Sequence, residues 1–211
     1  MSALRSLGVI AGLAAAPVVL KAPPAVPAQP GEPTTLDEVV GRCRDSRLAG
    51  WDLVGLAQQL VHDRYTHYSA WHLWQSPQQS FANGRGLSNQ YNSALAQVLE
   101  ELGFEVRRVH AARVRLERAP WWHSGHTWLK VTHEGRTRDV CASRPSTAPG
   151  RVAFVPVTPV RPFTGLTNLN TTLGLAPFVI EAVWRSLLTR EPTPRWLYRR
   201  FGEPVTTGSL P

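Results

Sequence analysis

Apolar residues recur at the spacing of an amphipathic helix in two regions of the first half of the chain. Residues 34–65 contain two stretches of this kind. Residues 88–102 contain a third, in which Tyr91 and Leu95 lie on the apolar face. Gly103 follows at a position where helices commonly terminate. The pattern therefore predicts three helices, of which the last spans residues 88–102.

The second half of the chain changes to the alternating pattern that is typical of β-strands. Residues 104–116 and 126–133 alternate, and residues 134–141 supply a turn and a partner strand that completes a hairpin. The remaining predictions are a loop over 117–125, a loop and a short proline-interrupted strand over 142–160, and a helix near 175–190. Helices followed by antiparallel strands predict an α+β fold, with a central helix packed on an antiparallel sheet.

The N-terminal segment is apolar. Residues 6–20 carry no charge, but a bilayer-spanning helix needs about 20 apolar residues. The run is closer in length to the apolar part of an export signal, although Pro17 and Lys21 depart from a clean signal pattern. Two interpretations stay open: the protein is exported or membrane-associated through residues 6–20, or it is cytoplasmic and the segment is an apolar helix packed on the domain.

The composition of the next segment suggests a boundary. Residues 21–33 are dense in proline and cannot hold a regular helix, so they are predicted to be a linker. We expect three parts along the chain. They are an apolar segment with its Pro-rich linker at 1–33, a folded core at 34–162 and a helical extension at 163–211.

The charge of the chain narrows the classes of partner. The 211 residues include 23 Lys and Arg and 15 Asp and Glu, a net charge of +8. The densest basic runs, residues 107–118 and 195–200, match no nucleic-acid-binding motif. We therefore expect no nucleic-acid partner, and attribute the charge to a solvated surface or to attraction for an anionic membrane.

Cysteine and histidine usage excludes two further classes of site. Cys43 and Cys141 are the only cysteines in the sequence, so neither a disulfide framework nor a multi-cysteine zinc site is available. Sequence alone does not show whether the two meet in one bridge. The histidines within 67–72 and 123–126 lack flanking cysteine or acidic ligands at zinc spacing. We therefore expect no bound metal.

Nucleophilic acyl transfer requires an attacking group, a base and a group that orients the base, and the chain offers one of each. Ser88 opens a predicted helix, His126 opens a strand, and Asp139 lies on the partner strand. A hairpin loop with an even number of residues places His126 and Asp139 on one face of the sheet. Each residue alone also has an ordinary explanation: a helix cap, a partly buried ring and an ion pair with a neighbouring arginine.

Two nearby residues extend this candidate site. The backbone amide of Asn89, with those that follow it, stands where an oxyanion would be stabilised at the helix start. Cys141 lies two residues beyond Asp139 and therefore on the same sheet face. Cys141 has two interpretations, a thiol or redox group beside the site and a small buried hydrophobic residue.

As a set, these residues resemble the nucleophile region of the transglutaminase-like superfamily, which includes arylamine N-acetyltransferases, transglutaminases and related bacterial peptidases. The resemblance rests on GRGLSNQYN at 84–92, and on a Leu-Gly pair whose Gly103 lies fifteen positions after Ser88. It rests also on GHTW at 125–128 and RDVC at 138–141. The overall length is more similar to that of small bacterial transglutaminase-like proteins of undefined activity. The similar region covers about residues 50–160.

The resemblance implies a papain-like core within 34–162 and a catalytic set of Ser88, His126 and Asp139, with Asn92 holding the helix–strand junction. It implies no cofactor, and an amide- or acyl-bearing small molecule or peptide as substrate. The family's nucleophile is cysteine, whereas this chain has Ser88. A serine forms no stable anion beside an imidazolium and must be deprotonated during attack.

Three functions stay open on this basis. The first is an acyltransferase or an amide or peptide hydrolase that works through a covalent acyl-enzyme on Ser88. The second is a family member that is catalytically silent. The third is a non-catalytic module that binds peptide or cell-surface polymer.

Overall fold

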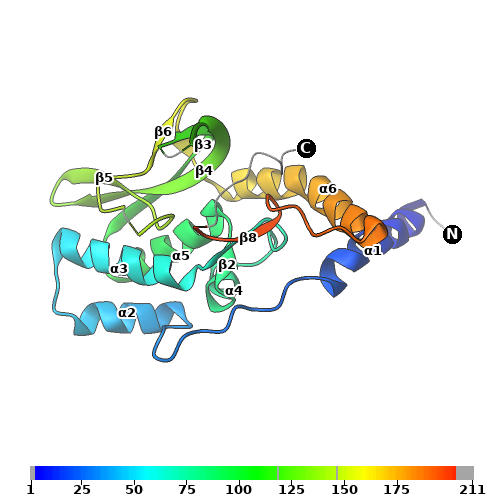
Figure 1. The fold of residues 1–211 in the computed structure, drawn as a ribbon. Coiled ribbons are helices and arrows are strands. Elements are labelled where there is room, and N and C mark those ends of the chain that lie inside the picture. The colour runs from blue at the N-terminus through cyan, green and yellow to red at the C-terminus, as the bar shows by residue number, and fades with distance from the viewer. Residues whose placement is uncertain (1–2, 118, 146, 203–211) are drawn as a thin grey trace.

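The computed structural model describes residues 3–117, 119–145 and 147–202, except for the side chains of 3–4, 7–8, 10–11 and 119–123. It is an α+β structure in which helices cover a curled antiparallel sheet (Figure 1). The helices are α1 (Ala3–Leu20), α2 (Leu36–Asp45), α3 (Gly50–Arg64), α4 (Pro77–Ala82), α5 (Ser88–Glu101) and α6 (Gly165–Thr189). The three helices predicted from residues 34–65 and 88–102 are confirmed as α2, α3 and α5.

Two helices differ from the prediction. Helix α4 lies where the sequence indicated only turns. A capping box starts it: the Ser76 hydroxyl accepts from the backbone amide of Gln79, and the Gln79 side chain accepts from the backbone amide of Ser76. Pro77 occupies the first turn of α4, where its missing N–H costs nothing. Helix α6 starts ten residues before the predicted position, at a capping box formed by Thr164 and Thr167.

The main sheet has the strand order β5-β4-β3-β6, with β7 paired to the free part of β3. Its strands are β3 (Glu105–Leu116), β4 (Ala119–His133), β5 (Arg136–Val140), β6 (Phe154–Pro156) and β7 (Arg161–Pro162). The predicted loop over 117–125 is wrong, because most of it extends β4 alongside β3. Pairs such as Val114 with Ser124 satisfy backbone groups that a loop would leave to solvent.

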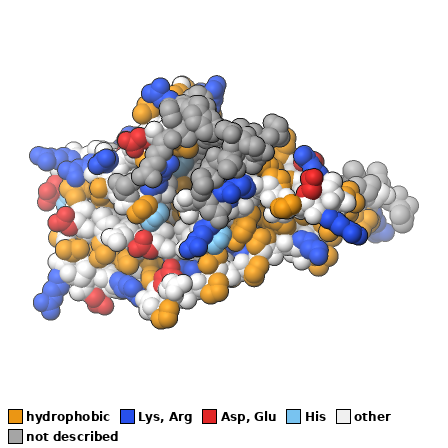
Figure 2. All heavy atoms as spheres, viewed as in Figure 1, with side chains coloured by type: hydrophobic (Ala, Val, Ile, Leu, Met, Phe, Trp, Pro, Cys, Tyr) orange, Lys and Arg blue, Asp and Glu red, His pale blue; other side chains and the backbone are white. Residues whose placement is uncertain are grey.

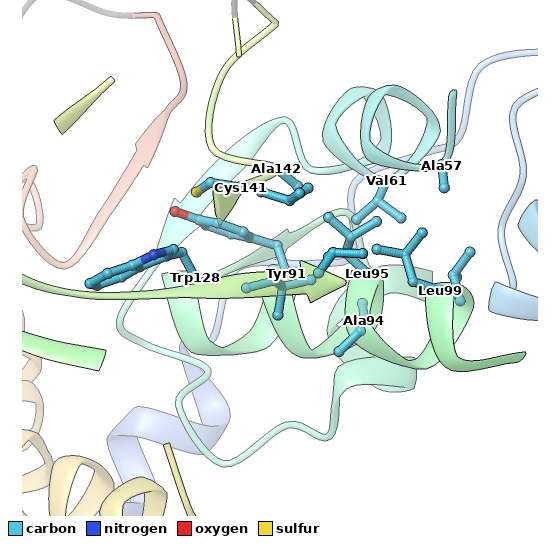
Figure 3. Close-up of a cluster of buried hydrophobic side chains, with 14 of the residues drawn as sticks. Ala57, Val61, Tyr91, Ala94, Leu95, Leu99, Trp128, Cys141 and Ala142 are labelled. Atoms are coloured by element: carbon cyan, nitrogen blue, oxygen red, sulfur yellow. The ribbon is translucent and has the colours of Figure 1, made fainter. Parts of the chain in front are cut away.

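Helix α5 is the centre of the fold. Its inner residues pack on β4 and against α3, and they form the main core with Trp128 and Val131 of the sheet (Figure 3). Leu95 and Leu99 are completely buried, as helical spacing requires for one face of an amphipathic helix. The middle and last turns of α5 are therefore anchored in the core.

A smaller sheet, β2-β1-β8, joins β1 (His67–Ser69) to β2 (Arg85–Gly86) and β8 (Tyr198–Arg200). It borders a second apolar cluster that is shared by residues from both ends of the chain. The cluster consists of Val18, Ala70, Trp71, Leu73, Leu87, Val179, Ala182, Val183 and Leu197. Helices α1 and α6 meet here and project together from one side of the molecule as an arm, in which their chain directions are opposite (Figure 1).

The proline-rich segment between α1 and α2 is extended, and buried arginines hold it against the core. Arg64 donates to the carbonyls of Val26 and Ala82, and Arg85 donates to the carbonyls of Pro23 and Pro24. Carbonyls of a segment without regular structure need donors when they are buried, and the two guanidinium groups supply them. No helix in the described part of the chain has both the length and the apolar character to cross a bilayer.

Candidate functional site

The turn before α5 depends on glycine. Gly84 has a φ of +66°, a left-handed conformation that glycine adopts without strain. A Cβ on Gly86 would lie 2.8 Å from the Ser80 hydroxyl oxygen and 3.0 Å from the Gln90 side-chain oxygen. The same Gln90 oxygen accepts from the amide of Leu87, the N-cap residue of α5. This close packing sets the position of the helix start.

Ser88 is the first residue of α5, but it is not the cap. Its hydroxyl oxygen accepts from the backbone amide of Thr127 at 3.3 Å, across to strand β4. Thr127 follows His126 directly, so the predicted nucleophile and the predicted base come from adjoining parts of the structure. The hydrogen bond of Ser88 is nevertheless made to the backbone of the strand. The interpretation of Ser88 as an ordinary helix cap therefore does not hold.

The ring of His126 lies against the thiol of Cys141. Its Nε2 is 3.3 Å from the Cys141 sulfur, and the ring packs edge-on against Phe154 with 4.5 Å between centroids. Only 8% of His126 is exposed and none of Cys141. Figure 3 shows the Cys141 sulfur at the border of the main core, beside the ring of Tyr91. Both cysteines of the chain are free and buried.

Asp139 is engaged at a different point of the sheet. Its carboxylate accepts from the Trp128 indole at 2.9 Å and from the Lys130 ammonium at 3.0 Å. In the β4–β5 ladder Asp139 is opposite Lys130, four residues along β4 from His126, which corresponds to about 13 Å of strand. The two-residue turn at 134–135 puts Asp139 on the expected face, and the register separates it from the imidazole.

Asn92 joins the helix to both site strands. Its completely buried side chain donates to the Thr127 carbonyl at 2.7 Å and to the Cys141 sulfur at 3.4 Å. The same side chain accepts from the amide of Ala142 at 3.0 Å. Asn92 thus occupies the helix–strand junction that the sequence resemblance implies for it, and it also touches Cys141.

Asn89 turns away from this cluster. Its side-chain amide donates to the Asn168 oxygen on α6 at 2.7 Å. The amides of Gln90 and Tyr91, next in the helix, donate to the Leu87 carbonyl, so they are not available to an oxyanion. Helix α5 therefore presents Asn92 to the sheet and Asn89 to the arm.

Burial controls the charge of the site. It lowers the pKa of His126 to about 3, and the positive charges of His110 and Arg144 act in the same direction. Burial also raises the pKa of the Cys141 thiol. The neutral imidazole and the neutral thiol are the stable forms at pH 7, because no adjacent carboxylate offsets the cost of removing a charge from water.

We expect protonation of His126 to destabilise the fold. A folded-state pKa below the unfolded value of about 6.5 means that the unfolded chain binds the proton first, so stability falls as pH falls below 6.5. One such group lowers the free energy of unfolding by about 2 kcal/mol between pH 6.5 and pH 5. His72, whose pKa burial lowers to about 4, adds to the same slope. Urea unfolding at a series of pH values measures it.

The variant His126→Gln isolates the contribution of this ring. It should remove the contribution of about 2 kcal/mol from His126 and leave the parts caused by His72 and by His110, whose pKa burial also lowers. A slope that is unchanged in His126→Gln would show that the imidazole is already solvated or paired in the folded protein.

A cavity of about 220 Å³ opens on the outer side of the α5 start. Polar side chains on α5 line it together with Arg108 of β3 and the first turns of α6. The lining residues are Pro77, Asn89, Gln90, Ser93, Gln97, Arg108, Phe163, Thr164, Gly165 and Asn168. Side-chain amides with one guanidinium suit the carbonyl, amide and carboxylate groups of a peptide.

No protein-family model matches the chain, and no curated protein sequence matches it at a significant level. Within the described residues, no group of three or more His, Cys, Asp and Glu side chains could hold a metal ion. Sequence reasoning gave a thiol beside the site as one interpretation of Cys141, but it named Asp139 and not Cys141 as the partner of His126. The available signal was the hairpin register. Asp139 pairs with Lys130, four residues from His126 along β4, and Cys141 follows two residues later, in the direction that approaches His126.

Proposed function

We propose that this protein is a transglutaminase-like domain whose acyl-transfer site is catalytically silent and which binds its ligand in the cavity beside the start of α5. The observation that carries the proposal is the partner of His126. The imidazole faces the neutral Cys141 thiol at 3.3 Å, while Asp139 is paired with Lys130. An acyl-transfer base requires a group that fixes its tautomer and stabilises the imidazolium formed during attack. A buried thiol does neither at neutral pH.

The geometry of Ser88 supports the same conclusion. Its oxygen accepts a hydrogen bond from Thr127, and a serine without a general base in contact is a weak nucleophile. A separate amide-lined cavity beside Asn89 and Asn168, on the outer side of the α5 start, provides a binding surface next to the silent site. Its size suits a few atoms of a peptide or of an amide-bearing polymer.

Reactivity of position 88 tests the proposal. The wild type should react with a fluorophosphonate probe no faster than Ser88→Ala, because Ser88 lacks an activated base. The double variant Ser88→Cys with Cys141→Asp installs a thiol at the start of α5 and a carboxylate beside His126. It should be alkylated by iodoacetamide at pH 7 at least about tenfold faster than Ser88→Cys alone, since an imidazolium beside the new carboxylate lowers the thiol pKa.

The variant Ser88→Cys with Asp139→Asn is the matched control. It should react like Ser88→Cys alone, because Asp139 contacts Lys130 and Trp128. Circular dichroism establishes that each variant is folded, and the buried native thiols give a low background. Fluorophosphonate labelling of the wild type that Ser88→Ala abolishes would overturn the silent site and favour a working serine enzyme.

A further inference from the structure

The arm formed by α1 and α6 exposes two apolar stripes. On α1, Val9, Leu13 and Leu20 are 60%, 66% and 80% exposed. Their spacings of four and seven residues place them on one face of the helix. Figure 2 shows hydrophobic side chains at the surface of this projecting part. Isolated exposed leucines are ordinary, but a helical stripe of them indicates a face that meets something apolar.

Helix α6 repeats the arrangement. Leu166, Leu169 and Leu173 are 67%, 52% and 60% exposed, and their spacings of three and four residues again define one face. A different face of α6, in the second half of the helix, carries Val179 and Val183, which pack in the second core. The leucine stripe is therefore left over after the helix has made its contacts with the described part of the protein.

Charge distinguishes between the candidate occupants of this surface. Residues 1–22 and 161–190, which contain the two helices and the residues that flank them, hold five Lys and Arg and one Glu, so they carry half of the net charge of +8. Within α6, Glu181 and Arg185 pair with each other. A second copy of the chain would bring two such basic surfaces together, whereas a bilayer with anionic headgroups complements both the charge and the apolar stripes.

We propose that the α1–α6 arm docks this protein on an anionic lipid membrane. The stripes of the two helices enter the boundary between headgroups and acyl chains, and the surrounding Lys and Arg contact lipid phosphate and carboxylate groups. The helices lie in the surface of the membrane. The inference is independent of the chemistry at Ser88.

Docking through α6 would also bring the candidate site to the membrane. The first turn of α6 lines the cavity, and the hydrogen bond of 2.7 Å between Asn89 and Asn168 ties it to the start of α5. A membrane that contacts Leu166 and Leu169 is then next to the opening that Asn168 borders. Ligands attached to the bilayer surface would be the first to reach it.

Sedimentation of the full chain with lipid vesicles tests the proposal. The wild type should bind vesicles of phosphatidylserine and phosphatidylcholine in a molar ratio of about 3 to 7. It should bind vesicles of pure phosphatidylcholine at least about tenfold more weakly. Added salt should weaken the binding to the anionic vesicles. The variant Leu169→Glu with Leu173→Glu should bind them at least about tenfold more weakly than the wild type, because it places two charges in the apolar stripe.

The variant Val155→Glu with Val157→Glu is the matched control. These residues are 53% and 48% exposed but lie at β6, away from the arm, so binding should be unchanged. The proposal is overturned if the wild type does not bind the anionic vesicles, or if both double variants lose binding equally. It is overturned also if size-exclusion chromatography with light scattering shows a dimer that Leu169→Glu with Leu173→Glu dissociates.

Discussion

Replacing Trp128 with alanine should lower the free energy of unfolding by about 4 kcal/mol. Trp128 is 1% exposed and is the largest fully buried side chain in the described structure. Its ring packs against Phe154 with 5.1 Å between centroids and lies next to the ring of His126. Removing it opens a cavity between the sheet and α5 that the rigid surroundings cannot fill. Urea unfolding monitored by circular dichroism measures the change.

Two substitutions separate packing from hydrogen bonding in this prediction. Trp128→Phe keeps an aromatic ring in the core. It removes part of the side-chain volume and the whole hydrogen bond from the indole N–H to Asp139, so the free energy of unfolding should fall by about 1–2 kcal/mol. Trp74→Ala removes a tryptophan that is 51% exposed and should cost less than about 1 kcal/mol. Equal losses for Trp128→Ala and Trp74→Ala would contradict the central position of Trp128 in the core.

Replacing Asn92 with alanine should cost about 3 kcal/mol, because it orphans two buried backbone groups. The Thr127 carbonyl and the Ala142 amide both lose their partner on Asn92, and each unsatisfied buried group costs about 1–3 kcal/mol. The same substitution removes the donor to the Cys141 sulfur. Alkylation of Cys141 by iodoacetamide should therefore become faster in the folded variant, since the segment that follows β5 and carries Cys141 is held less tightly.

Gln97→Ala serves as the control for Asn92→Ala on the same helix. Gln97 accepts from Gln78 at the surface of α5, where water replaces the lost partner, so the expected cost is below about 0.5 kcal/mol. If Asn92→Ala were equally mild, the junction between α5 and the site strands would be held by other contacts.

Several elements could be predicted from local pattern because their causes are local. Leu95 and Leu99 recur at helical spacing, and Gly103 has a φ of +88° directly after α5, which explains why the helix stops there. The hairpin of β4 and β5 could likewise be predicted from alternation and a short polar turn. Helix α4 was missed because six residues carry too little periodicity, although the capping pair Ser76 and Gln79 was present in the sequence.

The buried arginines were beyond sequence reasoning. Arg64 is 1% exposed, although arginine is usually a surface residue, and its partners at Val26 and Ala82 are distant in the chain. The leucine stripe on α6 lies before residue 175, where the predicted helix began, so the sequence pattern did not reveal it. The stripe faces the exterior because the second cluster covers a different face of α6, and only the tertiary structure shows which face that is.

By itself the sequence determined that Ser88 begins a helix, that His126 lies on a strand, and that Asp139 and Cys141 share a sheet face. These properties follow from backbone periodicity, which neighbouring residues set. The tertiary structure alone decided which side chain His126 meets. Strand register moves a side chain about 3.3 Å for each residue, so the four-residue offset removes Asp139 from the imidazole and leaves Cys141 beside it.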